Sequence, residues 1–157
     1  MLFVALLIVV AGFALHQGGA PEKCAAGLML FATAATFVVT ADRSATFANV
    51  QWKLLWIDAA LLVGLTVLAA FADRFWPMWV AALQLMAVAS HGARSFNPAV
   101  LPVAYWWIVT KMSYPMIALL ALGIWRHCAR KNVGKSEYCW TFQRHRAQAP
   151  ARTEGPR

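Results

Sequence analysis

Two ionisable residues stand inside apolar stretches of the sequence, where a charged side chain is unfavourable. Asp58 lies in the stretch 54–72, and Lys111 lies in the stretch 103–125. A charged residue at the centre of a membrane helix costs about 2.5–3.5 kcal/mol on insertion scales, so such residues usually pair or mark a functional site. With about 1.5 Å of rise per residue, the two would lie about 8 Å and about 12 Å below the same membrane boundary. We therefore predict that Asp58 and Lys111 pair across a bundle of transmembrane helices.

Further polar residues fall where they can join this pair. Tyr114 follows Lys111 by three residues, on the same helix face, and Gln84 and His91 are seven residues apart on one helical stripe. Pro115 cannot donate a backbone hydrogen bond to the carbonyl of Lys111, so it predicts a helix kink there. We predict one polar pocket near the outer membrane boundary, with these members: Asp58, Gln84, His91, Lys111 and Tyr114.

The same residues also have a purely structural interpretation. An ion pair inside a small bundle can serve only to fix the helix register. Lys111 and Asp58 can also extend separately towards the membrane surface, or contact a partner subunit. These alternatives require no ligand and no proton transfer.

Histidines and cysteines form two weaker patterns near the predicted cytoplasmic side. His16 and His127 follow the first and last apolar stretches, as two axial haem ligands on facing helices would. His127, Cys128, Cys139 and His145 are four residues of the types that bind zinc, but they lack the short spacings of zinc sites. We therefore expect no metal, no cofactor and no disulfide, and free thiols in a reducing cytosol.

The whole chain has the composition of a membrane protein. Of its 157 residues, 61% are hydrophobic and only 13% are charged, whereas soluble domains have about 25% charged residues. Because about 20 apolar residues span a bilayer, we predict an all-α, polytopic transmembrane helical bundle with five spans, or four if the first stretch does not cross. The predicted spans are 1–15, 24–41, 54–72, 76–90 and 103–125. The first is expected to be retained, because no Lys or Arg occurs before Lys23 to form the positive segment of a signal peptide.

Glycine, proline and charged residues separate these stretches. "HQGGAPEK" (16–23) is predicted to form a turn, because Gly, Gly and Pro interrupt helices. "ADRFWP" (72–77) predicts a tight helical hairpin, in which Asp73 and Arg74 face water and Pro77 starts the next helix. "HGARSFNP" (91–98) is predicted to be a loop between the last two spans.

The distribution of basic residues predicts the orientation. Residues 1–125 form the predicted bundle, and residues 126–157 form a basic tail, helical at first and then irregular, with eight of the 14 Lys and Arg residues. Positive residues favour the cytoplasmic side, so the C-terminus is predicted to be cytoplasmic. The tail is expected to bind anionic lipid head groups through Arg126, Arg130, Lys131 and Lys135. Tryptophans near both predicted boundaries are typical of interfacial belts.

No nucleotide-binding loop, nucleophile elbow, zinc-protease helix or redox cysteine pair is found. In its hydrophobic body the chain resembles the short polytopic inner-membrane proteins of bacteria. We predict a non-enzymatic integral protein of the cell inner membrane that is an accessory or scaffold subunit, either as a homo-oligomer or with a partner membrane subunit, and that binds no nucleic acid. The alternatives are a small oligomeric transporter or proton-coupled carrier that uses Asp58 and Lys111, and a haem- or quinone-linked redox protein.

Overall fold

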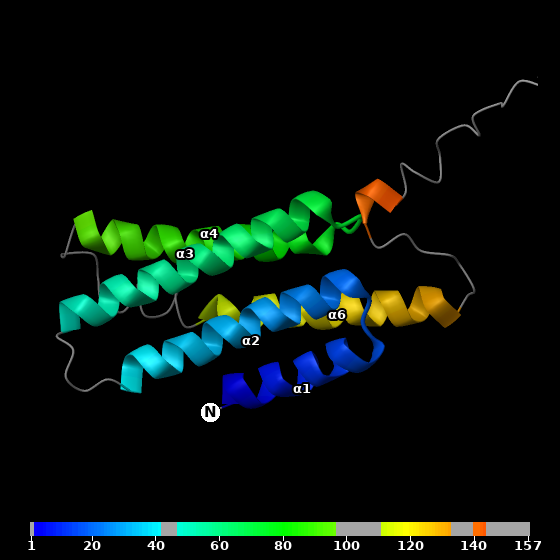
Figure 1. Ribbon diagram of the computed structural model, residues 1–157, viewed down its shortest axis with the longest axis horizontal. Helices are drawn as coiled ribbons and strands as arrows, with labels where there is room; N and C mark the ends of the chain where they lie inside the picture. The colour runs from blue at the N-terminus through cyan, green and yellow to red at the C-terminus, as the bar shows by residue number, and fades with distance from the viewer. Residues whose placement is uncertain (1, 42–46, 97–110, 133–139, 144–157) are drawn as a thin grey trace, which may run out of the picture.

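The computed structural model describes residues 2–41, 47–96, 111–132 and 140–143. In these ranges the fold is all-helical and contains no β-strand beyond an isolated bridge between Ala72 and Trp140. The long helices are α1 (Leu2–Gln17), α2 (Ala20–Ala41), α3 (Phe47–Phe71), α4 (Trp76–Phe96) and α6 (Ser113–Asn132) (Figure 1). The predicted all-α class is therefore confirmed for the described residues.

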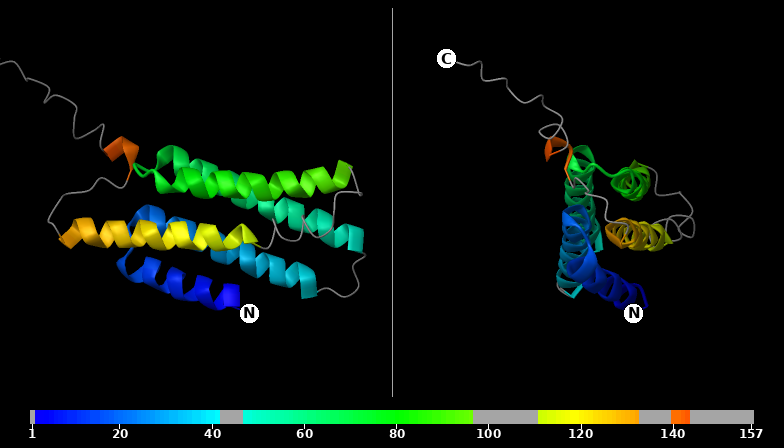
Figure 2. Two further views of the ribbon diagram at one scale, coloured as in Figure 1. Left: turned by 180° about the vertical axis from the view of Figure 1, so that it is seen from behind. Right: turned by 90° about the vertical axis from the view of Figure 1, so that its right-hand side faces the viewer.

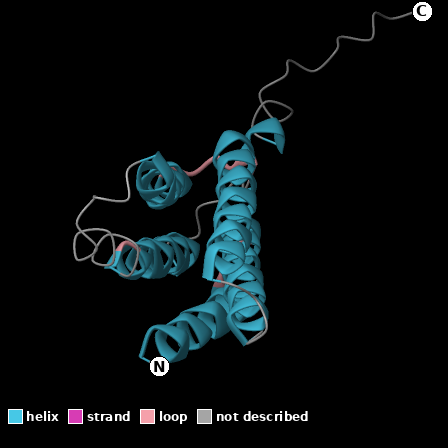
Figure 3. Cartoon of the chain, turned by 90° about the vertical axis from the view of Figure 1, so that its left-hand side faces the viewer, coloured by secondary structure: helices cyan, strands magenta, loops and turns pink. Residues whose placement is uncertain are grey.

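Successive helices run in opposite directions and pack in two layers. α1, α3 and α6 point one way, and α2 and α4 point the other way (Figure 1). The views along the bundle show α1, α2 and α3 in one layer and α4 and α6 in the other (Figures 2 and 3). α6 packs on α1, α2 and α4, and thereby joins the two layers.

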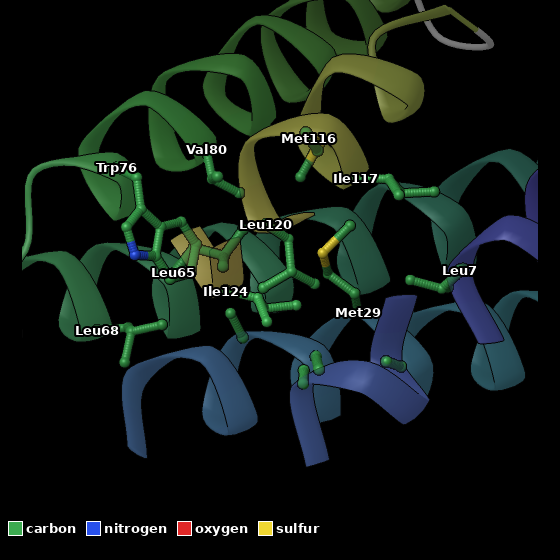
Figure 4. Packing of buried hydrophobic residues seen from close by; sticks show 14 residues of the cluster. Leu7, Met29, Leu65, Leu68, Trp76, Val80, Met116, Ile117, Leu120 and Ile124 are labelled. Atoms are coloured by element: carbon green, nitrogen blue, oxygen red, sulfur yellow. The ribbon is translucent and has the colours of Figure 1, made fainter. Parts of the chain in front are cut away.

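The apolar core lies between the two layers. Leu120 and Ile124 of α6 are buried among Met29 of α2 and Leu65 of α3 (Figure 4). Alanines form much of the remaining core on α1 and α2, at positions 11, 14, 25 and 26. Small side chains let helix backbones approach closely, so van der Waals contact extends along the bundle.

Two short turns connect the first four helices in pairs, and the turn predicted over 16–23 is wrong in its bounds, because residues 16–17 and 20–23 are helical. α1 ends at Gln17 and α2 begins at Ala20, so only Gly18 and Gly19 lie between them. A Cβ atom at Gly18 would collide with the carbonyl oxygen of Ala14, so this turn needs a glycine. The predicted hairpin is confirmed, since α3 ends at Phe71 and α4 begins at Trp76, with Pro77 in its first turn.

We call the end of the bundle that holds these two turns and the last turn of α6 the Glu22 end. The opposite end, with the start of α1 and α6, is called the His91 end. The described residues 140–143 lie at the Glu22 end, where the Thr141 hydroxyl donates a hydrogen bond of 2.8 Å to the carbonyl of Phe71. α6 itself runs to Asn132, so the helix continues into the predicted tail.

The predicted loop 91–98 is wrong over its first six residues, because α4 continues to Phe96. The physical reason lies in the side chain of His91, which is buried against α3 rather than exposed in a turn. The helix therefore continues through this position, and residues 97 and 98 lie outside the described ranges.

Two of the described helices are long and apolar enough to cross a membrane. They are α2 and the part of α3 from Trp52 to Phe71, with 22 and 20 residues. α1 is apolar but has only 16 residues. α4 carries Gln84, Ser90 and His91, and residues 103–110 of the fifth predicted span lie outside the described ranges.

Pro115 lies in the first turn of α6, which begins at Ser113. A turn at Met112 separates this helix from the helical residue Lys111. Proline is well tolerated in a first turn, because the first N–H groups of a helix have no partner inside it. In the described chain, Pro115 therefore lies at the start of a helix. The predicted kink belongs to a longer helix, whose first part, residues 103–110, lies outside the described ranges.

One testable consequence concerns Gly123, where α6 meets the ring of Trp76. A Cβ atom there would lie 2.8 Å from Trp76 Nε1 and 2.9 Å from Cε2. We expect Gly123→Ala to lower the free energy of unfolding by about 1–3 kcal/mol, the usual cost of overpacking. Thermal unfolding in detergent measures this change. Gly12→Ala is the matched control, because nothing lies within 4 Å of its Cβ position, and equal melting temperatures for both variants would contradict the packing described.

Candidate functional site: a polar cavity and a buried ion cluster

All five long helices line one cavity at the His91 end, with a volume of about 390 Å³. Its wall is mostly apolar, as in most sites for small ligands. Its polar side chains come from α2, α3, α4 and the start of α6, and they are Thr33, Thr36, Thr40, Asp58, Gln84, His91 and Ser113.

The carboxylate of Asp58 is held on both of its oxygens. The Gln84 amide donates to Oδ1 and to the Asp58 backbone carbonyl, each at 3.1 Å. His91 Nε2 lies 3.1 Å from Oδ2; this distance fits an ion pair when the imidazole is protonated, although the direction is not that of a hydrogen bond. Two turns of α4 separate Gln84 from His91, so both side chains face α3.

Exposure differs sharply within this group. The Asp58 side chain keeps 29% of its surface, whereas His91 keeps only 6%, and Gln84 is also buried. The buried side chains of Gln84 and His91 therefore position the Asp58 carboxylate, and Asp58 is the more exposed member of the group at the cavity. We call this arrangement the Asp58 site.

The threonine hydroxyls of α2 add acceptors to the wall of the cavity. Thr33, Thr36 and Thr40 donate to the backbone carbonyl four residues earlier, at 2.8–2.9 Å. Since a hydroxyl has one proton, these side chains can offer only lone pairs to a ligand. Together with the carboxylate, they give the cavity the character of a site for a cation or a hydrogen-bond donor.

The structure brings together three of the five residues predicted for one pocket. His91, rather than Lys111, is the ion-pair partner that it gives to Asp58. Lys111 is exposed, and its ammonium lies 5.7 Å from the ring centroid of Tyr114. Tyr114 packs edge-on against Phe3 of α1, with ring centroids 5.9 Å apart. Neither Lys111 nor Tyr114 lines the cavity.

A second polar group, at the Glu22 end, was not predicted. Glu22, in the first turn of α2, has no exposed surface. Trp76 Nε1 donates to its Oε1 at 3.3 Å, and Arg74 Nη1 lies 3.8 Å from the same oxygen. Arg74 Nη2 also lies 3.1 Å from His127 Nδ1. We call these four side chains, from α2, the α3–α4 turn, α4 and α6, the Glu22 cluster.

The prediction that Arg74 faces water is wrong, because its side chain is only 4% exposed. A buried carboxylate needs a positive partner, and Arg74 occupies that position. The sequence contains a usable signal for this contact. Glu22 and Arg74 are opposite charges near two helix connections that the alternating topology places at the same end.

Glycine makes room for this cluster. A Cβ atom at Gly19 would lie 2.9 Å from Glu22 Oε2 and 3.2 Å from His127 Cε1. Within the described residues, Oε2 has no hydrogen-bond partner, while Oε1 receives the tryptophan donor. The carboxylate is thus packed tightly on one oxygen and bonded through the other.

The residues of the haem and zinc patterns lie as follows. His16 is exposed at the end of α1, and His127 contacts Arg74. The Cys128 thiol lies 3.5 Å from the side-chain oxygen of Gln17. Cys139 and His145 lie outside the described ranges, and the described side chains contain no group of three metal-ligating residues.

Of the residues predicted to bind lipid head groups, Arg126 and Lys131 are exposed on the last turns of α6, and Arg130 is half-buried. Lys135 lies outside the described ranges.

Comparison with protein-family models, with curated proteins and with solved structures gives no match. The function is therefore inferred from the geometry of the Asp58 site and the Glu22 cluster.

The Glu22 cluster leads to a stability prediction. Glu22→Gln removes the negative charge but keeps the shape, and leaves Arg74 buried without its counter-ion. Breaking a buried pair in this way costs about 3–5 kcal/mol, so the melting temperature in detergent should fall clearly. Lys23→Gln, at the exposed neighbouring position, should leave it unchanged. The double variant Glu22→Gln/Arg74→Gln tests whether the two side chains interact. If its loss of unfolding free energy equals the sum of the losses in the two single variants, the side chains are not coupled.

Proposed function

We propose that the protein is a non-enzymatic, multi-pass protein of the bacterial inner membrane, and that it is an accessory or scaffold subunit of a larger membrane assembly. The observation that carries this proposal is the distribution of large apolar side chains. Phe31 and Trp56 are 76% and 72% exposed. All five long helices carry exposed large apolar side chains, and those of α6 are Leu122 and Trp125. Large apolar side chains exposed on this scale are unfavourable in water but suit lipid or a partner helix.

The tryptophans support the same location. Trp52 and Trp56 are exposed near the His91 end, and Trp79 and Trp125 are exposed near the Glu22 end. Tryptophan is enriched at both boundaries of a membrane, because its ring is apolar and its N–H is polar. Two levels of exposed tryptophan on one bundle fit that pattern.

The proposed orientation places the Glu22 end in the cytoplasm. Arg126, Arg130 and Lys131 lie on the last turns of α6 at this end, and five further basic residues follow in the sequence. Basic residues are retained on the cytoplasmic side of a membrane. The negative Asp58 site would then face the opposite side.

An accessory or scaffold role agrees with the use of the polar groups. The Glu22 cluster links α2, the α3–α4 turn and α6, while Gln84 and His91 link α4 to α3. These contacts fix the helices relative to one another and present constant outer faces. A partner membrane protein, or a second copy of the chain, is the proposed occupant of such a face.

Topology can be tested with reporters at the two ends. A green fluorescent protein fused after Gln143 should fluoresce, and an alkaline phosphatase fused there should be inactive, because the C-terminus is proposed to be cytoplasmic. Phosphatase inserted in the sequence between α2 and α3, whose adjoining ends lie at the His91 end, should be active. The reverse pattern would contradict the orientation, and solubility of the whole protein in alkaline carbonate would contradict membrane integration.

A second candidate function is a small proton-coupled carrier that uses Asp58, with His91 and Gln84 as its neighbours. The specific observation is the 29% exposed carboxylate in a cavity of about 390 Å³. A partly exposed acid beside a histidine can exchange a proton and can bind a cation. The participation of Lys111 in this site stays a prediction.

The two candidates differ in the expected effect of Asp58→Asn. For a carrier, this variant should abolish proton movement into proteoliposomes that contain a pH-sensitive dye, while its melting temperature changes little. For a scaffold, proton movement should equal that of empty vesicles for the native protein and the variant. Thr66→Val is the matched control, because Thr66 lies on the exposed face of α3 and its hydroxyl bonds only to the carbonyl of Leu62.

A further inference from the structure

A second cavity, of about 330 Å³, lies between the start of α4 and the end of α6 at the Glu22 end. Three arginines are among its lining residues: Arg74, Arg126 and Arg130. We call it the arginine pocket. Asp73 also lines it, and Arg74 contacts the buried Glu22 carboxylate. Even when both acids are counted, the three arginines leave a net positive charge.

Two independent constraints bring the arginines together. Arg126 and Arg130 are four residues apart on α6, so they lie on the same helix face. Arg74 comes from the α3–α4 turn and is fixed there by Glu22 and His127. A guanidinium group has five N–H donors in a planar fork, which suits the oxygens of a phosphate.

The first turn of α4 adds to the positive character of the pocket. Trp76, the first residue of this 21-residue helix, lines the pocket together with Phe75. The first N–H groups of a helix have no partner inside it; Pro77 lacks an N–H group, but the helix dipole is positive at this end. Both effects favour an anion near the start of α4.

The other side of the pocket is apolar and extends towards the middle of the bundle. Leu122 and Leu119 precede Arg126 on α6 by about one and two turns, respectively. Trp79 faces them from α4 and packs edge-on against Phe75, with centroids 6.0 Å apart. Leu122 and Trp79 are 43% and 55% exposed, so an apolar chain can lie against both.

We propose that the arginine pocket binds an anionic glycerophospholipid, with the phosphate at the three arginines and an acyl chain along Leu122 and Trp79. Basic pockets between helices on the cytoplasmic side of a membrane are suited to such head groups. The proposal rests on the proposed membrane location, but it goes beyond the general attraction of a basic tail to a membrane. It assigns one site, one ligand class and the residues that hold it.

The test compares variants that lose one positive charge each. Arg126→Gln and Lys131→Gln remove equal charges from nearby turns of α6, but only Arg126 lines the pocket. Phosphatidylglycerol or cardiolipin, added to the detergent-solubilised protein, should bind the native chain and raise its melting temperature. Phosphatidylcholine should not. We expect about tenfold weaker lipid binding or more for Arg126→Gln, the effect of one lost charge-assisted hydrogen bond, and near-native binding for Lys131→Gln.

Other outcomes overturn the proposal in distinguishable ways. Equal losses for Arg126→Gln and Lys131→Gln would mean general electrostatic attraction without a site. An equal effect of inorganic phosphate would mean a site for a soluble phosphate compound instead of a lipid. Absence of binding to either anionic lipid, for a protein that stays in carbonate-washed membranes, would refute the lipid site and leave the proposed membrane function standing. A protein that the carbonate wash releases would refute both.

Discussion

Burial of the Glu22 carboxylate is the constraint on which one whole end of the molecule depends. An ionised carboxylate without exposed surface loses its hydration, and this cost is offset only by an opposite charge and by hydrogen bonds. Arg74 and Trp76 both reach the same oxygen, and His127 contacts Arg74 from α6. Three segments that are distant in the sequence are thereby held at one point. The closeness of Gly19 and Gly123 to this group follows, because any larger residue would displace a member of it.

α4 connects this cluster with the Asp58 site. Trp76 starts the helix at one end of the bundle, and Gln84 and His91 follow eight and fifteen residues later, close to the same helix face. Between the two polar groups, the side chains buried against α6 are apolar, such as Val80 of α4 and Leu65 of α3. The polar contacts are therefore concentrated near the two ends, and dispersion between small and apolar side chains joins the helices along the middle.

Much of this fold can be predicted from the sequence, whereas the partners of its charged residues cannot. The apolar runs predict helices, and Gly18, Gly19 and Pro77 predict the two short turns, because these effects are local. The seven-residue spacing of Gln84 and His91 also predicts a shared stripe. The counter-ion of Asp58 cannot be predicted in this way. Depth along the bundle limits the candidate partners, but it does not give the rotation of each helix about its axis, which decides which side chain faces Asp58. His91 and Lys111 both satisfy the depth argument, and packing of α4 on α3 brings His91 to the carboxylate.

The position of a charged residue in a turn proved equally insufficient. Its place in the short run 72–77 predicts that Arg74 faces water, yet its side chain contacts Glu22 of α2 and His127 of α6. Pro21 contributes to the predicted turn 16–23, whereas in the structure it lies in the first turn of α2, and the next side chain, Glu22, is fully buried. In both cases, the decisive information is the path of a neighbouring segment, which local sequence does not contain.

The two acids of the bundle interior differ in the property that decides their chemistry. Glu22 has no exposed surface, and tightly packed neighbours surround it. A ligand could reach it only by opening the end of the bundle. Asp58 also has polar neighbours, but its side chain is 29% exposed and it lines an existing cavity. A ligand or a proton can therefore reach Asp58 without any change in helix packing. Glu22 contributes to the interior structure of the bundle, and Asp58 is the acid that can also interact with something outside it.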